Sequence, residues 1–392
     1  MKQYDIVIAG GAMVGSTLAL ALDHLSQQGL SIAVIEPYAV DNDAPHPGFD
    51  SRSIALSYGT KLILEKFQLW SVIEPFTTAI DHIHVSDRGQ IGVTHIDKTE
   101  QCVPALGYVV ELADVGSLYK QRIDNCKQID YLCPDSVARI DRERDFTLVT
   151  LTSGQVLCCQ ILVAADGADS TCCNLLGHEQ TEYDFEQVAI ITNVEISEPH
   201  HGRAFERFTS SGPLAFLPMS NNRMSVVWCL KPEQVQKTLV FSDEEFIAEL
   251  QTQFGWRLGK ILRVGKKASY PLILKKKQQI VSHRFATVGN AAQLLHPIAG
   301  QGFNLGIRDV ESLASKLVGQ KDVGDFSLLS QYRKCREDDR DRTIELISTM
   351  VHIFSNDWFP LQLGRNVALM AMDNSRLFKS PLLGRTMGLV RK

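Results

Sequence analysis

Apolar residues open the chain in a short continuous run, and a helical pattern follows within a few positions. Residues 4–9 read Y-D-I-V-I-A, which predicts a strand, and residues 16–22 read S-T-L-A-L-A-L, which predicts a helix. A second apolar run at residues 31–36, S-I-A-V-I-E, predicts another strand. The order strand, helix, strand indicates a βαβ unit at the start of an α/β domain.

A glycine-rich turn, G-G-A-M-V-G, joins the first strand to the helix. We expect Gly10 to make the tight turn, Gly15 to let helix and strand pack closely, and the helix N-terminus to receive a pyrophosphate. Gly11 and Ala12 complete the turn, and Ala12 stands where the usual G-x-G-x-x-G motif has its middle glycine. The alternative is an ordinary βαβ unit with glycines at its corner.

Acidic residues end two of the predicted strands. Glu36 closes the second strand, about twenty residues beyond the glycine turn, where it could hydrogen-bond the ribose hydroxyls of an adenosine. A third segment, I-L-V-A-A-D-G-A-D-S at residues 161–170, predicts a buried strand that stops at Asp166 and Gly167. An acid beside a phosphate site can bind a ribitol hydroxyl, and the glycine keeps the backbone close to the ligand. Taken singly, Asp-Gly is more often a plain turn.

The run G-N-A-A-Q-L-L-H-P-I-A-G-Q-G-F-N-L-G occupies residues 289–306. Its small residues let the backbone approach a flat ligand, and its glycines permit positive φ. The helix start within it offers free amide hydrogens to an anion. These parts suit a flavin ring and its diphosphate.

In this order and at these separations, the three segments resemble those of the class A flavin-dependent aromatic hydroxylases, which have the fold of p-hydroxybenzoate hydroxylase. In that family the first segment carries the ADP part of FAD, the second contacts ribose and ribitol, and the third cups the isoalloxazine. The resemblance implies an α/β fold class, with a Rossmann-like FAD-binding domain, a β-sheet substrate domain and a helical C-terminal tail. It implies FAD as the cofactor and NAD(P)H as the electron donor.

Within this class the chain is similar to the ubiquinone-biosynthesis hydroxylases, whose third motif has the form H-P-I-A-G-Q-G-F-N-L-G-x-R-D, present at residues 296–309. The segments at residues 84–89, 202–209, 212–219 and 254–261 are similar to those of 2-octaprenyl-6-methoxyphenol hydroxylases. The resemblance covers essentially the whole chain.

The resemblance implies a monooxygenase of a polyprenylated phenol that uses O2. The expected reaction converts 2-octaprenyl-6-methoxyphenol to 2-octaprenyl-6-methoxy-1,4-benzoquinol through a flavin hydroperoxide. One alternative is a sister hydroxylase of the same pathway that acts at another ring position. Alternatives from other classes are an FAD-binding assembly subunit and a flavin dehydrogenase that inserts no oxygen.

The resemblance also assigns roles to single residues. The FAD site is expected to comprise Gly10, Gly11, Ala12, Gly15, Glu36, Arg52, Asp166, Gly167, Gly289, Asn290, Pro297, Gly300, Gln301, Gly302, Phe303 and Asn304. The candidates for a catalytic role are His296, Pro297 and Arg52, and no catalytic base is assigned.

Each of the three catalytic candidates has an expected role, and for Arg52 and His296 a purely structural explanation is also open. In the family an arginine in the loop of Arg52 lies close to the flavin, whereas an isolated loop arginine is usually solvated or ion-paired. Pro297 is expected to fix the bend beside the ring. His296 either tunes a proton or caps the turn. The backbone amides of Gly300 to Phe303 are expected to stabilise negative charge on the ring.

The chain departs from the wider family at two places. Asn290 stands where the family has an aspartate, and Cys172-Cys173 stands where it has a valine and an arginine. Asn290 keeps a hydrogen-bonding side chain but lacks the negative charge near the ribityl phosphate. We therefore expect FAD to be held less tightly or released more readily.

Composition narrows the class of protein. The chain has 392 residues, 44% of them hydrophobic, which fits two closely packed globular domains. A net charge of −5 argues against nucleic-acid binding as the main task. The nine cysteines are odd in number and form no C-x-x-C motif, which favours free thiols in a reducing cytosol and predicts no metal site. No export signal or membrane span is recognisable, so a cytoplasmic location is expected.

The expected domains are interleaved along the chain. The FAD-binding domain is assigned residues 1–80, 101–182 and 281–325. The substrate domain is assigned a strand within residues 81–100 and the β-rich residues 183–280, and residues 326–392 form the C-terminal helical region.

Two further features leave alternatives open. Residues 250–308 contain no acid but many Lys and Arg, which are either solvated or form a basic face for NAD(P)H phosphates or anionic lipid. Residues 350–372, rich in Phe, Trp, Met and Leu, form either a core or dimer helix, or an interfacial helix that docks on partner enzymes of a ubiquinone-biosynthesis complex. The lipid substrate implies peripheral contact with the inner face of the cytoplasmic membrane, and a homo-oligomer is an option.

Overall fold

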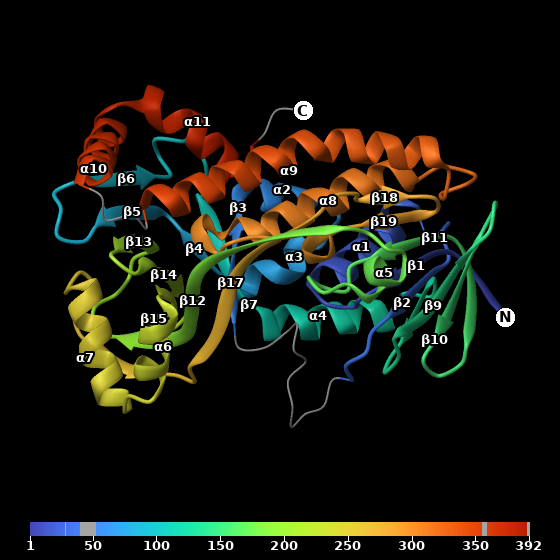
Figure 1. The fold of residues 1–392 in the computed structure, drawn as a ribbon, viewed down its shortest axis with the longest axis horizontal. Helices are drawn as coiled ribbons and strands as arrows, with labels where there is room; N and C mark the ends of the chain where they lie inside the picture. The colour runs from blue at the N-terminus through green and yellow to red at the C-terminus, as the bar shows by residue number, and fades with distance from the viewer. Residues whose placement is uncertain (28, 40–51, 355–358, 390–392) are drawn as a thin grey trace.

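The fold is given by a computed structural model that describes residues 1–392 except 28, 40–51, 355–358 and 390–392. Figure 1 shows two β-rich regions joined by long strands, with the C-terminal helices lying along the top of the molecule. The predicted mixture of an α/β region, a second sheet and C-terminal helices is present.

The first sheet contains eight strands and is largely parallel. Its main order is β18 (Val281–Ser282), β19 (Phe285–Thr287), β11 (Val156–Ala164), β1 (Lys2–Ala9), β2 (Ile32–Ile35) and β8 (Ile129–Leu132), with β10 (Thr147–Leu151) pairing β11 and β9 (Val137–Arg142). The predicted strands at residues 4–9, 31–36 and 161–164 thus lie side by side, and all run in the same direction.

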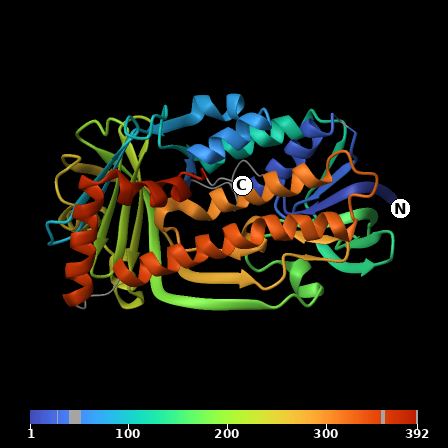
Figure 2. The ribbon, with the colours of Figure 1, turned by 90° about the horizontal axis from the view of Figure 1, so that it is seen from above.

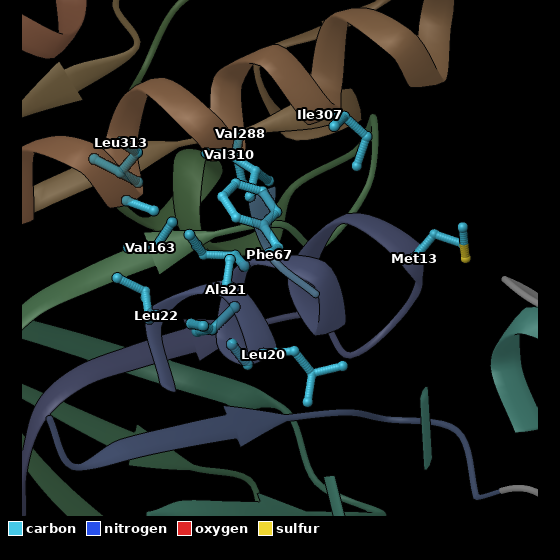
Figure 3. Close-up of a cluster of buried hydrophobic side chains, with 14 of the residues drawn as sticks. Met13, Leu20, Ala21, Leu22, Phe67, Val163, Val288, Ile307, Val310 and Leu313 are labelled. Carbon is cyan, nitrogen blue, oxygen red and sulfur yellow. The ribbon is translucent and has the colours of Figure 1, made fainter. Parts of the chain in front are cut away.

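Helices pack on one face of this sheet and residues of β9 and β10 on the other, so both faces of its central strand are buried. On β1, Ile6 and Ile8 belong to one hydrophobic core, and Val7 and Ala9 belong to another on the opposite face. A strand buried on both faces requires the continuous apolar run seen in the sequence. The first core also holds apolar residues of α1 (Met13–Leu25), α4 (Leu112–Asp124), α8 (Gln301–Leu317) and α9 (Phe326–Phe354), part of which Figure 3 shows. Figure 2 shows α8 and α9 lying along the length of the molecule.

The second sheet contains nine strands and is antiparallel except for one pair. Its main order is β20 (Gln293–Leu294), β17 (Ala268–Lys277), β12 (Gln180–Ile196), β15 (Arg223–Leu230), β14 (Gly212–Met219), β13 (Arg203–Thr209), β5 (His82–Asp87) and β6 (Val93–Asp97), with β16 (Ile261–Val264) on β12. The strand expected within residues 81–100 is two strands, β5 and β6, and β5 runs parallel to β13. The exact domain limits stay a prediction.

One face of the second sheet is covered by two short helices. α6 (Pro232–Leu239) and α7 (Asp243–Phe254) bury Phe216, Trp228 and their neighbours in a separate core. A small third sheet, β3 (Ser53–Ser57), β7 (Gly107–Glu111) and β4 (Thr77–Ile80), is accompanied by α2 (Tyr58–Lys66), α3 (Trp70–Ile73) and the 3-10 helix η1 (Glu74–Phe76).

Cysteine thiols are distributed through the cores. All nine are free, and Cys158, Cys159, Cys172, Cys173 and Cys229 are buried. Cys172 and Cys173 lie on the short helix α5 (Thr171–Leu175), where they join the second core of the first sheet. At this position the chain thus buries two thiols that pack as small apolar side chains.

The C-terminal tail ends in α10 (Phe359–Asn374) and α11 (Arg376–Thr386). A buried ion pair fastens α10 to the edge of the second sheet: Arg365 Nε lies 2.6 Å from Asp87 Oδ2. Asn366 Nδ2 donates to the same oxygen at 3.3 Å. Part of the tail therefore packs as core. Among the described residues, no helix is both long and apolar enough to cross a membrane.

The substitution Arg365→Met tests this attachment. It leaves the Asp87 carboxylate buried without its cation, which costs about 3–5 kcal/mol of unfolding free energy. Urea denaturation should report this loss, and limited proteolysis should show faster cleavage near α10. The control Arg139→Met breaks an exposed pair with Asp141 and should change stability by less than about 0.5 kcal/mol. Equal effects of the two substitutions would contradict the assignment.

Candidate functional site

The turn after β1 has the geometry of a tight phosphate-binding loop. Gly10 has φ of 103°, and a Cβ there would lie 2.4 Å from the carbonyl oxygen of Ala165. A Cβ on Gly15 would lie 1.8 Å from the Gly10 carbonyl oxygen. Both distances are far below van der Waals contact, so these two positions require glycine. Their expected contact with a diphosphate stays a prediction.

The N-terminus of α1 faces this loop without a side-chain cap. The N-cap residue is Ala12, and the first turn contains no acid. A helix start of this kind leaves backbone amides for an anion, as a diphosphate requires.

The Glu36 carboxylate holds this loop in place through hydrogen bonds to backbone amides. It is 2% exposed, its Oε2 accepts from the Gly11 amide at 2.7 Å, and its Oε1 accepts from the Tyr38 amide at 3.0 Å. A carboxylate has further lone pairs beyond these two bonds, so the expected bond to a ribose hydroxyl stays a prediction.

Asp166 follows β11 and reaches the same neighbourhood, because the Cβ position of Gly10 lies 2.9 Å from its amide nitrogen. Its Oδ2 accepts from the Cys172 amide at 3.1 Å, whereas its buried Oδ1 has no hydrogen-bond partner among the described residues. A buried acceptor without a donor is costly, and a ligand hydroxyl would supply one. Gly167, with φ of 86°, has open space around its Cβ position. This pair therefore fits the ribitol part of FAD.

The start of the third motif packs directly on the first. A Cβ on Gly289 would lie 3.0 Å from Val14 of α1, and one on Gly306 would lie 3.1 Å from the Gly289 Cα. Asn290 follows in the 3-10 helix η2 (Gly289–Ala291) and is exposed. Residues that lie almost 280 positions apart in the chain are thereby in contact.

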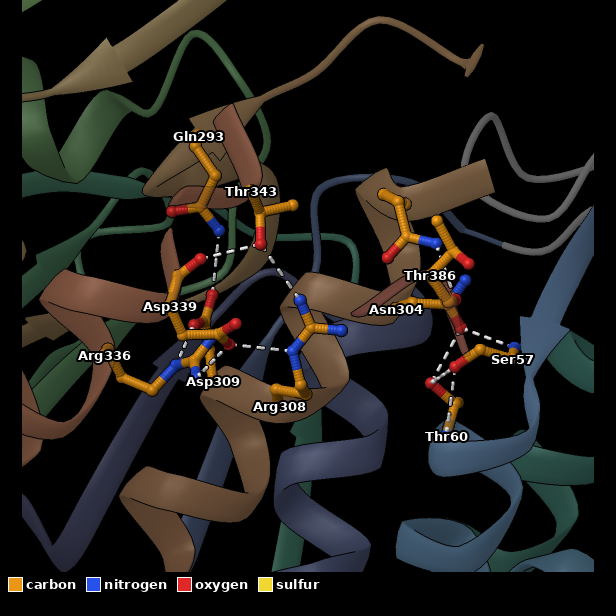
Figure 4. Close-up of polar contacts among 11 residues, drawn as sticks. Ser57, Thr60, Gln293, Asn304, Arg308, Asp309, Arg336, Asp339, Thr343 and Thr386 are labelled. Atoms are coloured by element: carbon orange, nitrogen blue, oxygen red, sulfur yellow. Dashed lines mark hydrogen bonds and ion pairs between the residues drawn. The ribbon is translucent and has the colours of Figure 1, made fainter. Parts of the chain in front are cut away.

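A buried carboxylate holds Gly289 in place, and Figure 4 shows its surroundings. Asp309 Oδ2 accepts from the Gly289 amide at 3.1 Å and from Gln293 Nε2 at 2.9 Å. Its Oδ1 accepts from Arg336 Nε at 2.7 Å. The sequence analysis missed this role, although Asp309 ends the quoted third motif.

Asp339 completes the same network. Its Oδ2 accepts from Arg308 Nε at 2.8 Å and from Arg336 Nη1 at 2.6 Å. These two guanidinium groups hold the pKa of the Asp339 carboxyl below its usual range, although burial alone would raise it.

The bend of the third motif is left-handed. Pro297 precedes the 3-10 helix η3 (Ile298–Gly300), in which Ala299 has φ of 57° and Gly300 has φ of 60°. Ala299 is a strained non-glycine residue at this bend. The Gly300 amide donates to the Pro297 carbonyl oxygen at 2.9 Å. That amide is thus already used within the turn, which leaves the expected charge stabilisation to the uncapped first turn of α8.

His296 is buried and has partners at both ring nitrogens. Nδ1 accepts from the Ile298 amide at 3.2 Å, and Nε2 lies 3.2 Å from Gln187 Oε1, to which it donates in the matching tautomer. Burial lowers the pKa of His296 to about 4. The ring is therefore neutral at neutral pH, and this geometry favours the turn-capping alternative over proton tuning.

Asn304 and Gln301 hold the loop to its surroundings. Asn304 Oδ1 accepts from the Ser57 amide at 2.8 Å and from Thr60 Oγ1 at 2.7 Å, as Figure 4 shows. Gln301 Nε2 donates to the Thr386 carbonyl oxygen at 2.9 Å. Both side chains thus position the loop, and their expected contact with FAD stays a prediction.

The remaining expected site residues lie around this loop. Gly302 has open space at its Cβ position, and Phe303 packs partly buried against the main core. The Arg52 carbonyl accepts from the Leu112 amide at 2.9 Å, and its guanidinium carbon lies 5.3 Å from the centre of the Tyr270 ring. Arg52 therefore reaches the second sheet.

Acids from elsewhere in the chain form ion pairs with several residues of the basic stretch. These ion pairs are Arg263 with Glu195, Lys267 with Asp243, Lys275 with Asp169 and Glu182, Lys276 with Asp341, and Arg284 with Asp322. This pairing favours ordinary surface charge over a basic face for phosphates or anionic lipid.

A separate hollow of about 550 Å³ lies beside β5, β6 and β13. Its lining includes His82, His84, His95 and Arg257. The described parts of the chain contain no group of three or more His, Cys, Asp and Glu residues that could hold a metal ion. None of the glycine motifs lines this hollow.

Comparisons with known proteins agree with this geometry. The family model of the FAD binding domain matches residues 136–345. The chain is 33% identical to ubiquinone hydroxylase UbiL of Rhodospirillum rubrum, over 100% of this chain and 91% of that protein. It is 28% identical to 3-demethoxyubiquinol 3-hydroxylase of Escherichia coli, over 98% of both.

The fold also matches a solved structure. The p-nitrophenol 4-monooxygenase PnpA of Pseudomonas putida has a TM-score of 0.81 and 19% identity, over 100% of both chains. The predicted fold class is therefore confirmed.

The unpaired oxygen of Asp166 leads to a binding prediction. Asp166→Ala should raise the dissociation constant of FAD about 10- to 100-fold, because it removes a charged hydrogen-bond acceptor. Titration of the apoprotein by flavin fluorescence measures this. The control Asp169→Ala removes a carboxylate that is 81% exposed on the same loop and should change the constant by less than about threefold. Equal weakening by both substitutions would contradict the role of Asp166.

The buried ring of His296 predicts a pH effect on stability. Because its pKa is lowered to about 4, unfolding takes up a proton below pH 6.5, and stability is lost as pH falls from 6.5 towards 4. This group alone contributes about 3 kcal/mol of that loss. In His296→Asn, which keeps an acceptor for the Ile298 amide, urea denaturation should show a correspondingly smaller dependence on pH. Identical pH slopes in both proteins would refute the assignment.

Proposed function

This chain belongs to the family of FAD-dependent ubiquinone-biosynthesis hydroxylases, and we propose that it oxidises 2-octaprenyl-6-methoxyphenol to 2-octaprenyl-6-methoxy-1,4-benzoquinol. It is an FAD-dependent aromatic hydroxylase, and its site fits the cofactor. The observation that carries the proposal is the full-length similarity to a ubiquinone hydroxylase, together with the unpaired Asp166 oxygen beside two glycine turns.

The protein's own tasks follow from the site. Bound FAD supplies the oxygen activation. Gly10, Gly15 and the start of α1 would hold the diphosphate, Asp166 the ribitol, and the loop from Pro297 to Asn304 would lie against the ring. The Asp309 network keeps this last loop fixed to α9. NAD(P)H is the proposed electron donor, as it is for the class as a whole.

A second candidate substrate has specific support. The relative in Escherichia coli is named 3-demethoxyubiquinol 3-hydroxylase, and it matches 98% of this chain at 28% identity. A sister reaction at another ring position is therefore the alternative to the proposed one.

We also propose that the enzyme works in the cytoplasm at the inner face of the membrane, since its substrate is a lipid. Leu363, Val367 and Met370 of α10 are 58%, 57% and 41% exposed. Their spacing of four and three residues places them on one side of the helix, as a lipid-facing contact requires. The same exposed side is the proposed contact for a partner enzyme or a second copy if lipid does not cover it.

Labelled oxygen tests the proposed reaction. FAD-loaded protein supplied with NADH or NADPH, 18O2 and 2-octaprenyl-6-methoxyphenol should give the benzoquinol with one labelled oxygen para to the phenol hydroxyl. Mass spectrometry of the extracted lipid measures it, and protein stripped of FAD is the control.

Other outcomes identify the alternatives. Labelled product from a demethoxyubiquinol only would indicate the sister reaction. Oxidised product without label would indicate a dehydrogenase. An absence of turnover with every quinone precursor would indicate an assembly subunit. In a deletion strain, the accumulating lipid should be the same substrate.

A further inference from the structure

The second sheet turns one face towards the third motif. Strand β13 pairs with β14 and β5 without any shift in register, so its side chains alternate strictly between the two faces. Phe205 packs in the core under α7, whereas Phe208 packs with Leu295 and Ile298 of the third motif. We call the side that carries Ala204, Glu206 and Phe208 the inner face.

A row of residues crosses the inner face at Glu206. In register across β5, β13, β14, β15 and β12 it consists of Val85, Glu206, Ala215, Val227 and Ile191. Every member except Glu206 is apolar. All five are partly accessible, while Phe205, Leu214, Val226 and Ile190 on the other face are fully buried. This row of the inner face is therefore incompletely covered and apolar, with one carboxyl group in its middle.

Glu206 has no hydrogen-bond or ion-pair partner among the described residues. Burial raises the pKa of its carboxyl to about 7, although the residue as a whole is only partly buried. Two titratable groups of this face stand within two positions of the row. The Cys229 thiol of β15 has its own pKa raised by burial. That thiol is neutral. The Asp87 carboxylate of β5, opposite Phe208, is paired with Arg365. The other residues of the row do not titrate.

A carboxyl group without a hydrogen-bond partner at such a position lowers the stability of the fold, which points to a functional reason for it. Desolvation opposes its ionisation, and replacing it by an apolar side chain would complete the row. An aromatic substrate with a hydroxyl group would supply both the apolar contact and the missing hydrogen-bond donor.

We propose that the Glu206 carboxylate binds the phenol hydroxyl of the substrate and accepts its proton during hydroxylation. This inference rests on the proposed function and names a residue for the role that the sequence analysis left unassigned. The tertiary arrangement carries it: a carboxyl group without a hydrogen-bond partner stands in an apolar row of the face that packs against the third motif.

Glu206 takes up the phenol proton and later gives it back. The phenol O–H bond breaks, its electron pair stays on the phenol oxygen, and the proton moves to a Glu206 carboxylate oxygen. The resulting phenolate is the stronger nucleophile towards the activated oxygen supplied by FAD and O2. When the ring carbon gains its oxygen, it loses its hydrogen as a proton, which ends in water with the second oxygen atom of O2. The proton on Glu206 returns to the phenol oxygen, so Glu206 ends in its starting state.

The substitution Glu206→Gln tests the proposal by ligand binding. The probes are 2-methoxy-6-methylphenol and its methyl ether, which lacks the hydroxyl proton, and their binding is read from perturbation of the bound FAD spectrum. Above pH 7.5 the unsubstituted protein should prefer the phenol about tenfold or more, and Glu206→Gln should lose that preference. The control Glu244→Gln changes an exposed glutamate of α7 and should keep it. Equal preference in all three proteins would overturn the proposal.

Turnover gives a second readout. Glu206→Gln should retain its FAD and lower kcat about 100-fold, with more O2 consumed per hydroxylated product. In the unsubstituted protein kcat/KM should rise with pH through about 7, and this limb should be missing in Glu206→Gln. A flat profile from pH 5.5 to 8.5 in the unsubstituted protein would overturn the proposal, even if the variant failed to fold.

Stability supplies a measurement that needs neither substrate nor turnover. Because the folded-state pKa is raised, the folded protein holds this proton more tightly, and stability is lost as pH rises through about 7. The melting temperature should therefore fall less with rising pH in Glu206→Gln than in the unsubstituted protein.

Glu206→Asp keeps the carboxylate and should retain part of the preference for the phenol.

Failure of the inference and failure of the proposed function look different. If the unsubstituted protein hydroxylates the polyprenylated phenol and Glu206→Gln does so equally well, only the role of Glu206 is wrong. If the unsubstituted protein neither binds the phenol probe nor hydroxylates the lipid, the proposed function is wrong, and the role of Glu206 falls with it.

Discussion

The arrangement of the loops in the candidate FAD site depends on one buried carboxylate, that of Asp309. It is 2% exposed and sits among the Gly289 amide, the Gln293 amide group and the Arg336 guanidinium. A charge buried at this depth is tolerated only when its hydrogen bonds are made, so none of these three partners can move far without leaving it unpaired. The third motif, α8 and α9 are therefore held together as one unit. This unit also fixes the position of Gly289, which packs against α1.

The local parts of this fold were accessible from sequence, because they follow from neighbouring residues. The strand, glycine turn and helix at the start of the chain need only an apolar run, two glycines at a corner and a helical pattern, and Gly10 and Gly15 prove to be sterically necessary. The parallel partners β2 and β11 were likewise predicted from apolar runs. The contacts that the sequence did not predict join segments far apart in the chain. Asp309 meets an arginine 27 positions later, and Asn304 meets Ser57 at a separation of 247. No local pattern records such pairs.

The same limit explains why the sequence overstated the basic character of residues 250–308 and did not single out Glu206. Residues 250–308 read as a basic stretch because the acids that neutralise them stand elsewhere in the sequence, on β12, α7 and α9 among other places. Glu206 was passed over for the opposite reason. Both faces of β13 carry a mixture of apolar and charged residues, so the alternation from Arg203 to Phe208 does not tell which face is enclosed. Only the register with four neighbouring strands shows that the carboxyl group stands in a row of apolar side chains.

The buried cysteines bear on how this oxygen-using enzyme ages. Burial raises the pKa of the Cys159, Cys172 and Cys173 thiols, and the thiolate is the form that peroxide attacks. These thiols are therefore protonated and packed in the second core of the first sheet, where peroxide released by unproductive turnover finds no thiolate to attack. Oxidative damage should begin instead at the exposed Cys102 and Cys335, at the surface, where a sulfenic acid can form and be reduced again without disturbing the fold.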